Sequence, residues 1–110
     1  MTKEKSLRKP ADFKKVFKEG KRLLSPRFVL YVRDNALPQA RVGISIAKIH
    51  FKLATRRNQL RRAAKETIRQ EAGRFIKGCD LVVTSRASTL KPDINESIVE
   101  LKELIRKLKK

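Results

Sequence analysis

The sequence predicts an α+β fold, in which helices pack against one four-stranded sheet in the order α-β-β-β-α-β-α. Apolar residues recur at helical spacing in three separate segments, and runs of strand-forming residues lie between them. The length of 110 residues suits one domain with a single modest core. We therefore expect a single domain over residues 1–110.

The first predicted element is a short helix over residues 11–19. Phe13, Val16 and Phe17 follow the i, i+3, i+4 spacing of one helix face, and Gly20 is a typical stop signal.

Extended structure is predicted next, over "RLLSPRFVLYVRD" at residues 22–34. Ser25 and Pro26 interrupt this run, which predicts two short segments or a bend between them. The turn-forming sequence "DNALPQA" then leads into a third strand at residues 41–47.

The second half of the chain predicts a helix, a strand and a helix. A basic helix spans about residues 53–72 and a fourth strand spans residues 79–85. The last helix begins near Asp93, which stands three residues before Glu96 as in a capping box. Its apolar stripe is expected to pack on the sheet and comprises Ile94, Ile98, Leu101, Ile105 and Leu108.

Charge gives the first functional indication. The chain has 29 Lys and Arg against 11 Asp and Glu, a net charge of +18. The repulsion among these positive charges is tolerated best when the protein binds a polyanion, and nucleic acid is the commonest polyanionic partner. The plainer alternative is a merely solubilising basic surface. A membrane partner is not expected, because no apolar run approaches the roughly 20 residues that span a bilayer. No signal-peptide segment follows the basic N-terminus, so a cytoplasmic location is expected.

The chain has too few cysteine and histidine residues for a disulfide bond or a metal site built from these side chains. One cysteine, Cys79, excludes an internal disulfide, and with His50 as the one histidine no His/Cys metal site is expected. We interpret Cys79 as a small buried strand residue and His50 as a loop residue. No protein-bound cofactor is expected.

The predicted basic helix separates apolar from cationic side chains. At 100° per residue, Leu53, Leu60, Ala64 and Ile68 fall on the face expected to pack on the sheet. An adjoining arc is cationic, and Glu66 and Glu71 are expected to point away from it. The arc either solubilises the protein or meets phosphates. It comprises Asn58, Arg61, Arg62, Lys65 and Arg69, with Arg57 at its edge.

Three aromatic residues are the second candidate site. Phe13 and Phe17 face the same way on the first helix, and Tyr31 lies on a strand expected nearby. Such residues most often belong to the core. In a partly open cleft beside the basic helix they would instead stack on unpaired bases, as in proteins that bind single-stranded RNA.

Several segments together resemble a known family. "RRNQLRR" follows the strand "VGISIAK", and "ADFKKVFKEGKR" and "RFVLYV" lie upstream. In this order they resemble the protein component of bacterial ribonuclease P over nearly the whole chain. The resemblance implies that family's four-stranded sheet and a left-handed crossover between the third and fourth strands. The general rule for parallel strands favours the opposite hand.

The resemblance also implies a function and its residues. In the family, an RNA subunit cuts the 5′ leader from precursor tRNA with Mg²⁺ that the RNA mainly holds. The protein binds ribonuclease P RNA and precursor tRNA, with no obligate protein partner expected. The residues matching the RNA-subunit contact are Arg56, Arg57, Asn58, Arg61, Arg62, Lys65 and Arg69. Those matching the leader cleft are Phe13, Phe17 and Tyr31, with Lys48 and Lys52 at its basic edge.

No catalytic residue is predicted in the protein itself. One histidine cannot form an acid and base pair, and turn or capping roles explain Asp12, Asp34, Asp80 and Asp93. Three rival classes remain at this point. They are a ribosomal or other small structured-RNA-binding protein, a basic nuclease acting alone, and a DNA-binding module that uses the basic helix.

Overall fold

The computed structural model describes residues 5–6, 10–36, 40–72, 78–87 and 93–108. Within these ranges the predicted α+β class and the order of elements are confirmed, and one two-residue strand precedes them. The elements are β1 (Lys5–Ser6), α1 (Pro10–Glu19), β2 (Lys21–Leu24), β3 (Phe28–Asp34), β4 (Arg41–Ser45), α2 (Ala54–Ala72), β5 (Cys79–Ser85) and α3 (Ile94–Lys107).

The strands form one sheet in the order β1-β4-β5-β3-β2. The four predicted strands make up its body, and β1 adds a short parallel edge beside β4. β3 runs antiparallel to both β2 and β5, whereas β4 and β5 are parallel. Because parallel neighbours require a crossover, the chain passes from β4 to β5 through α2. The left hand that the resemblance implies for this crossover stays a prediction.

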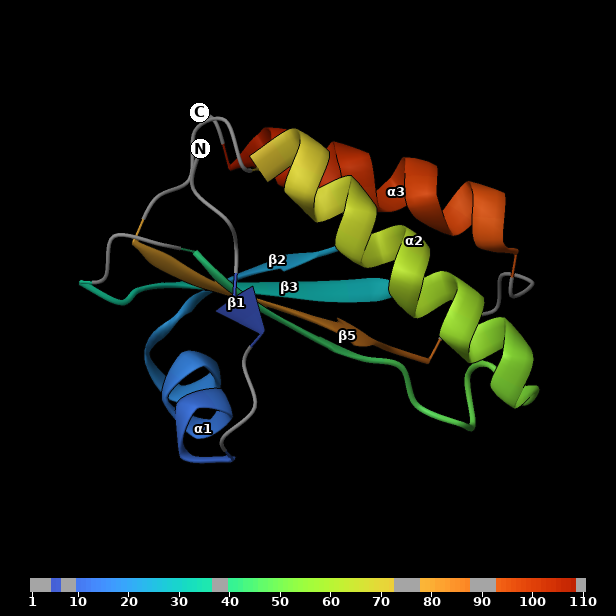
Figure 1. The fold of residues 1–110 in the computed structure, drawn as a ribbon, viewed down its shortest axis with the longest axis horizontal. Coiled ribbons are helices and arrows are strands. Elements are labelled where there is room, and N and C mark those ends of the chain that lie inside the picture. The colour runs from blue at the N-terminus through green and yellow to red at the C-terminus, as the bar shows by residue number, and fades with distance from the viewer. Residues whose placement is uncertain (1–4, 7–9, 37–39, 73–77, 88–92, 109–110) are drawn as a thin grey trace.

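The helices lie on opposite faces of the sheet. α2 and α3 lie side by side over one face, and α1 lies on the other (Figure 1). The main core fills the space beneath α2 and α3, where Leu30, Leu60 and Leu101 are fully buried. A smaller cluster beneath α1 contains Val16 and Val82. Two helices thus pack over one face of the sheet, and α1 contacts the other.

Gly20 fixes where α1 ends. Its N–H donates to the carbonyl of Val16 at 2.9 Å, which closes the last turn. A Cβ atom at this position would lie 2.5 Å from the Val16 oxygen and 2.8 Å from the Val32 oxygen. Both are backbone atoms that cannot rotate away, so only glycine lets the chain pass this close to β3 before β2 begins.

The N-terminus of α3 is capped as predicted. The Asp93 carboxylate accepts a hydrogen bond of 2.8 Å from the backbone N–H of Glu96. The Glu96 carboxylate, however, pairs with Arg27 at 2.9 Å, and Glu100 pairs with the same guanidinium at 3.0 Å. Arg27 is buried, so this group ties the start of β3 to α3.

Two predictions about burial are wrong. Leu53 was expected on the buried face of the basic helix, but it precedes α2 and is 64% exposed. The prediction began the helix at Leu53, one residue before its true start, so the helical spacing did not apply there. Leu60, Ala64 and Ile68 are buried as predicted. Cys79 is half-buried at the start of β5 instead of fully buried. None of the described helices is long and apolar enough to cross a bilayer.

Candidate RNA interface

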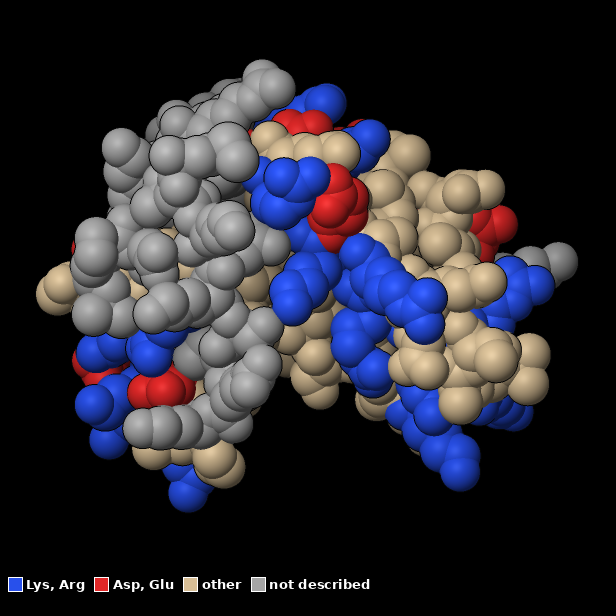
Figure 2. Space-filling model, in the orientation of Figure 1, with Lys and Arg blue, Asp and Glu red and all other residues tan. Residues whose placement is uncertain are grey.

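The cationic arc predicted on the basic helix lies on the surface of α2. Figure 2 shows Lys and Arg gathered along this helix toward its first turn. Arg57 is half-buried, while the other predicted contact residues are exposed: Arg56, Asn58, Arg61, Arg62, Lys65 and Arg69. No ion pair is found for Arg56, Arg61 or Arg62 within the described ranges. Their charge is therefore available to an anionic partner.

Arg57 has a structural task that the sequence did not reveal. Its Nη1 donates to the carbonyl oxygens of Phe51 at 2.9 Å and Lys52 at 3.0 Å. The guanidinium thus fastens the β4–α2 connection to the first turn of the helix. One turn later, Arg61 Nη1 donates to Asn58 Oδ1 at 2.9 Å, which orients both side chains on the surface.

The prediction that Glu66 points away from the arc is wrong. Its carboxylate accepts hydrogen bonds from both Nε and Nη2 of Arg69, and the amide of Gln70 also donates to it. The bond from Arg69 is the main reason that the pKa of Glu66 is lowered. Arg69 therefore offers less net charge to a partner than Arg61 or Arg62. Glu71 does lie elsewhere, 3.3 Å from Arg106 on α3.

The three predicted aromatic residues come together between α1 and the sheet. The rings of Phe17 and Tyr31 meet edge to face with centroids 4.8 Å apart, and Phe13 lies 6.2 Å from Phe17. Phe13 and Tyr31 are partly buried against the cluster beneath α1, but Phe17 remains 43% exposed. The group is thus neither wholly core nor wholly surface. Two rings support a third that is accessible from solvent.

The sheet continues beyond this aromatic group as an open surface. Strand register places Leu24, Val29, Thr84 and Ser45 in one row on the same face as Tyr31. Leu24 is 50% exposed, although it is a large apolar residue. In Figure 2 the outline of the molecule is hollowed between α1 and the first turn of α2. The sequence missed this row, because only strand pairing brings the four residues together.

Lys48 and Lys52 lie exposed in the β4–α2 connection. Figure 1 shows the first turns of α2 extending past the strand ends toward the side that carries α1. The basic start of α2 and helix α1 therefore lie on the two sides of one hollow, although the body of α2 covers the opposite face of the sheet.

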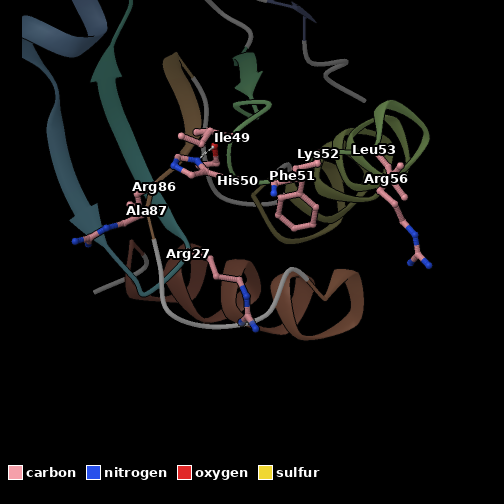
Figure 3. Close-up of a pocket in the computed structure, with 10 residues that line it drawn as sticks. Arg27, Ile49, His50, Phe51, Lys52, Leu53, Arg56, Arg86 and Ala87 are labelled. Carbon is pink, nitrogen blue, oxygen red and sulfur yellow. Dashed lines mark hydrogen bonds between the residues drawn. The ribbon is translucent and has the colours of Figure 1, made fainter.

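A pocket also opens at this end of the molecule, with a volume of about 760 Å³. It lies at the carboxyl ends of the parallel strands β4 and β5 (Figure 3). Of its wall residues, only Lys52 and Arg56 were predicted from the sequence as candidate RNA-contact residues. Loops from separate parts of the chain meet here, so no local pattern could have indicated it. Other wall residues are Arg27, Ile49, Phe51, Leu53 and Arg86.

Several of the described acidic residues have structural partners. Asp80 was assigned a turn or capping role, which is wrong: it is fully buried in β5 and accepts hydrogen bonds from Arg41 and Asn35. Burial raises the pKa of Asp80, but these hydrogen bonds and the Arg41 charge outweigh it, so the pKa is lowered. Asp12 pairs with Arg41 at 3.3 Å. Within the described ranges, no three His, Cys, Asp or Glu side chains gather as a metal site would require.

The Cys79 thiol is also poorly suited to chemistry. Burial and the hydrogen bond to Asp34 raise its pKa to about 11, so the reactive thiolate is scarce at neutral pH.

Fold and surface together define a small basic α+β domain with a cationic helix on one face of its sheet and a partly open aromatic group on the other. Residues 1–109 match the Ribonuclease P family model. The chain belongs to the ribonuclease P protein family.

Individual relatives agree with this assignment. The ribonuclease P protein component of Thermotoga maritima is 44% identical over 85 residues, which cover 77% of this chain and 72% of the relative. That of Clostridioides difficile is 41% identical over 102 residues, 88% of each chain. The solved ribonuclease P protein from Thermotoga maritima superposes with a TM-score of 0.74 at 33% identity, covering 94% of this chain and 96% of that one. The ribonuclease P protein from Staphylococcus aureus gives 0.74 at 27% identity, covering 97% and 94%.

Proposed function

We propose that this ribonuclease P protein binds the catalytic RNA subunit through α2 and the single-stranded 5′ leader of precursor tRNA through the aromatic surface beside α1. The observation that carries the proposal is the hollow between α1, the helix on which Phe17 is exposed, and the cationic start of α2. One rigid domain would thereby hold a folded RNA and an unpaired strand at the same time.

Binding to the RNA subunit is assigned to the exposed cations of α2. Arg61 and Arg62 present guanidinium groups with no ion pair within the described residues, and planar guanidinium groups bind phosphate with two parallel hydrogen bonds. Arg56 and Lys65 extend the same surface, and Asn58 hydrogen-bonds Arg61 there. Arg57 contributes by holding the β4–α2 connection in place.

Binding to the leader is assigned to Phe17, Tyr31 and the neighbouring sheet row. An unpaired base stacks on an accessible aromatic ring, and Phe17 offers such a ring held by Tyr31. Lys48 and Lys52, both exposed in the β4–α2 connection, would meet the leader phosphates. This arrangement favours single strands over duplexes, because paired bases do not expose their faces.

Bond cleavage is assigned to the RNA subunit and the Mg²⁺ that it holds. Several acids among the described residues are engaged in the protein's own structure: Asp80 by Arg41 and Asn35, Asp93 at a helix cap, and Glu100 by Arg27. The task left for the protein is electrostatic and geometric. Its net charge of +18 offsets the repulsion between two RNAs, and its hollow fixes the path of the leader.

Reconstitution tests this function directly. Cleavage of precursor tRNA is measured with the partner RNA alone, with the protein alone, and with both, in the presence of Mg²⁺. We expect efficient 5′ cleavage only when both are present at physiological salt, and none with the protein alone. Cleavage by the isolated protein would instead indicate a nuclease. Failure to stimulate the RNA, with another cellular RNA co-purifying, would favour a structured-RNA-binding protein of a different kind.

A further inference from the structure

The pocket at the carboxyl ends of β4 and β5 has an apolar lining that the proposed function leaves unused. Its volume of about 760 Å³ falls within the range of about 300–1,000 Å³ typical of sites for small organic groups. The β4–α2 connection, the first turn of α2, the end of β5 with the two residues after it, and the residue before β3 all contribute to its wall (Figure 3). It is separate from the aromatic group, because none of its wall residues belongs to α1.

Apolar side chains line much of this pocket. Phe51 is buried, but Ile49 is 78% exposed and Leu53 is 64% exposed. Two large aliphatic side chains left in solvent four residues apart cost solvation free energy without adding to the core. Their exposure is explained if a flat apolar group covers them in the assembled particle.

Cations stand around the apolar centre. Lys52, Arg56 and Arg86 belong to the wall, and none of its wall residues in the described part of the chain is acidic. Arg27 also belongs to it, but Glu96 and Glu100 already neutralise its charge. In Figure 3 Arg56 and Arg86 lie on opposite sides of the pocket, and their guanidinium groups point outward, away from its centre. An occupant with an apolar middle and negative charge on both sides fits this arrangement.

The wall is also held in shape before anything binds. Ser85 Oγ accepts a hydrogen bond of 2.8 Å from the Ala47 N–H and lies 2.7 Å from His50 Nδ1. The Arg86 N–H donates to the Arg27 carbonyl at 2.9 Å. Arg57 donates to the carbonyl oxygens of Phe51 and Lys52, as described above, and so holds this part of the wall in place. A preformed pocket loses little conformational entropy when it is filled.

We propose that this pocket receives one unpaired nucleotide of the RNA subunit. Its base lies against Ile49 and Leu53, and the phosphates on its two sides meet Arg56 and Arg86. A nucleotide within a strand has the required chemistry, since a flat base stands between two negative phosphates. The RNA subunit is the source because Arg56 belongs to the first turn of α2, so the pocket continues the cationic surface assigned to that RNA. The inference rests on the proposed function.

The test compares the double variant Ile49→Ala Leu53→Ala and the variant Arg86→Ala with the wild-type protein. The matched control is Val99→Ala, because Val99 is a comparably exposed aliphatic residue on α3, at 57%. Three quantities are measured: the dissociation constant for the RNA subunit, the methylation of its unpaired bases by dimethyl sulfate, and the ratio of affinities for leader-bearing and leaderless tRNA.

We expect the double variant to bind the RNA subunit about tenfold more weakly, and Arg86→Ala to show a loss of similar size. One base that the wild-type protein protects should become reactive in both variants, while Val99→Ala leaves it protected and the leader ratio is unchanged. If both variants bind the RNA subunit as tightly as Val99→Ala and protect the same base, the proposed role of the pocket is wrong. The proposed function would still stand. A fall in the leader ratio alone would assign the pocket to the leader and overturn the proposal. If the wild-type protein itself fails to bind the RNA, both proposals are wrong.

Discussion

The guanidinium of Arg41 holds the carboxylate of Asp80 with two hydrogen bonds, Nε to Oδ1 and Nη2 to Oδ2, each 2.8 Å long. Asn35 adds a third from its amide, also 2.8 Å long. Asp80 is fully buried, so its charge depends on these donors for the stabilisation that water would otherwise supply. This group joins three segments, because the donors lie on β4 and just after β3 while the acceptor lies on β5.

Replacing Asp80 with Asn should lower the free energy of unfolding by about 3 kcal/mol, since it leaves Arg41 without its main partner in a partly buried position. Urea denaturation followed by circular dichroism measures this loss. Asp12→Asn is the matched control, because Asp12 also pairs with Arg41 but at 3.3 Å and with more solvent access. Its loss should be about 1 kcal/mol or less. Equal losses would show that burial of Asp80 contributes little.

The same carboxylate should make stability depend on pH. The pKa of Asp80 is lowered in the folded chain, so its contribution is present above the unfolded-state pKa of about 3.9 and is lost as the pH falls through the folded-state value. The difference in unfolding free energy between wild type and Asp80→Asn should therefore be constant near neutral pH and shrink below about pH 4. Denaturation curves across an acid series test this, and a difference that stays constant down to about pH 2 would contradict it.

Gly20→Ala should destabilise the protein by about 1–3 kcal/mol, the usual cost of forcing an added group into a packed site. The added carbon would lie within 2.8 Å of two backbone oxygens, on Val16 and Val32, so α1 must shift relative to β3. Thermal denaturation measures the effect. Lys15→Ala, at an exposed position of α1, serves as the control and should leave the melting temperature nearly unchanged.

Features set by neighbouring residues were predictable from the sequence. The helix-spaced Phe13, Val16 and Phe17 and the stop signal at Gly20 gave α1 to within one residue, because local spacing and local backbone freedom determine a short helix. The Asp93 cap was predictable for the same reason. The α+β fold class, the order of the helices and strands, and the cationic character of α2 were predictable from such local patterns.

Features set by distant residues were not predictable. Asp80 has its donors 39 and 45 positions away in the chain, so no local rule indicates that it is a buried ion-pair acceptor. Glu66 shows a related failure: it lies only about 60° from Arg69 around the helix, close enough for an i, i+3 pair that a division into faces overlooks. The pocket needs loops to converge, and this information resides in the tertiary structure.

Replacing Arg61 and Arg62 together with Ala should weaken binding of the RNA subunit without unfolding the protein, because both are exposed on α2. Two lost phosphate contacts should make the slope of log K against log salt shallower by about 1.4 to 1.8. Filter binding across a salt series measures both quantities. Arg69→Ala is the control, since Glu66 already offsets its charge, and it should change the slope less. Equal slopes for all proteins would remove α2 from the interface.

Phe17→Ala should reduce the preference for leader-bearing over leaderless tRNA, because the exposed ring is the one proposed to stack on a leader base. Loss of one stacked base corresponds to about 1–3 kcal/mol. Since Phe17 also contacts Tyr31, the variant is expected to lose some stability, and Phe17→Leu therefore serves as a second variant that keeps apolar volume but no ring. If both variants lose the preference for leader-bearing tRNA while Phe17→Leu remains folded, aromatic stacking is responsible for that preference. If Phe17→Leu keeps the full preference, Phe17 acts as a packing residue and the leader must be recognised elsewhere on the sheet face.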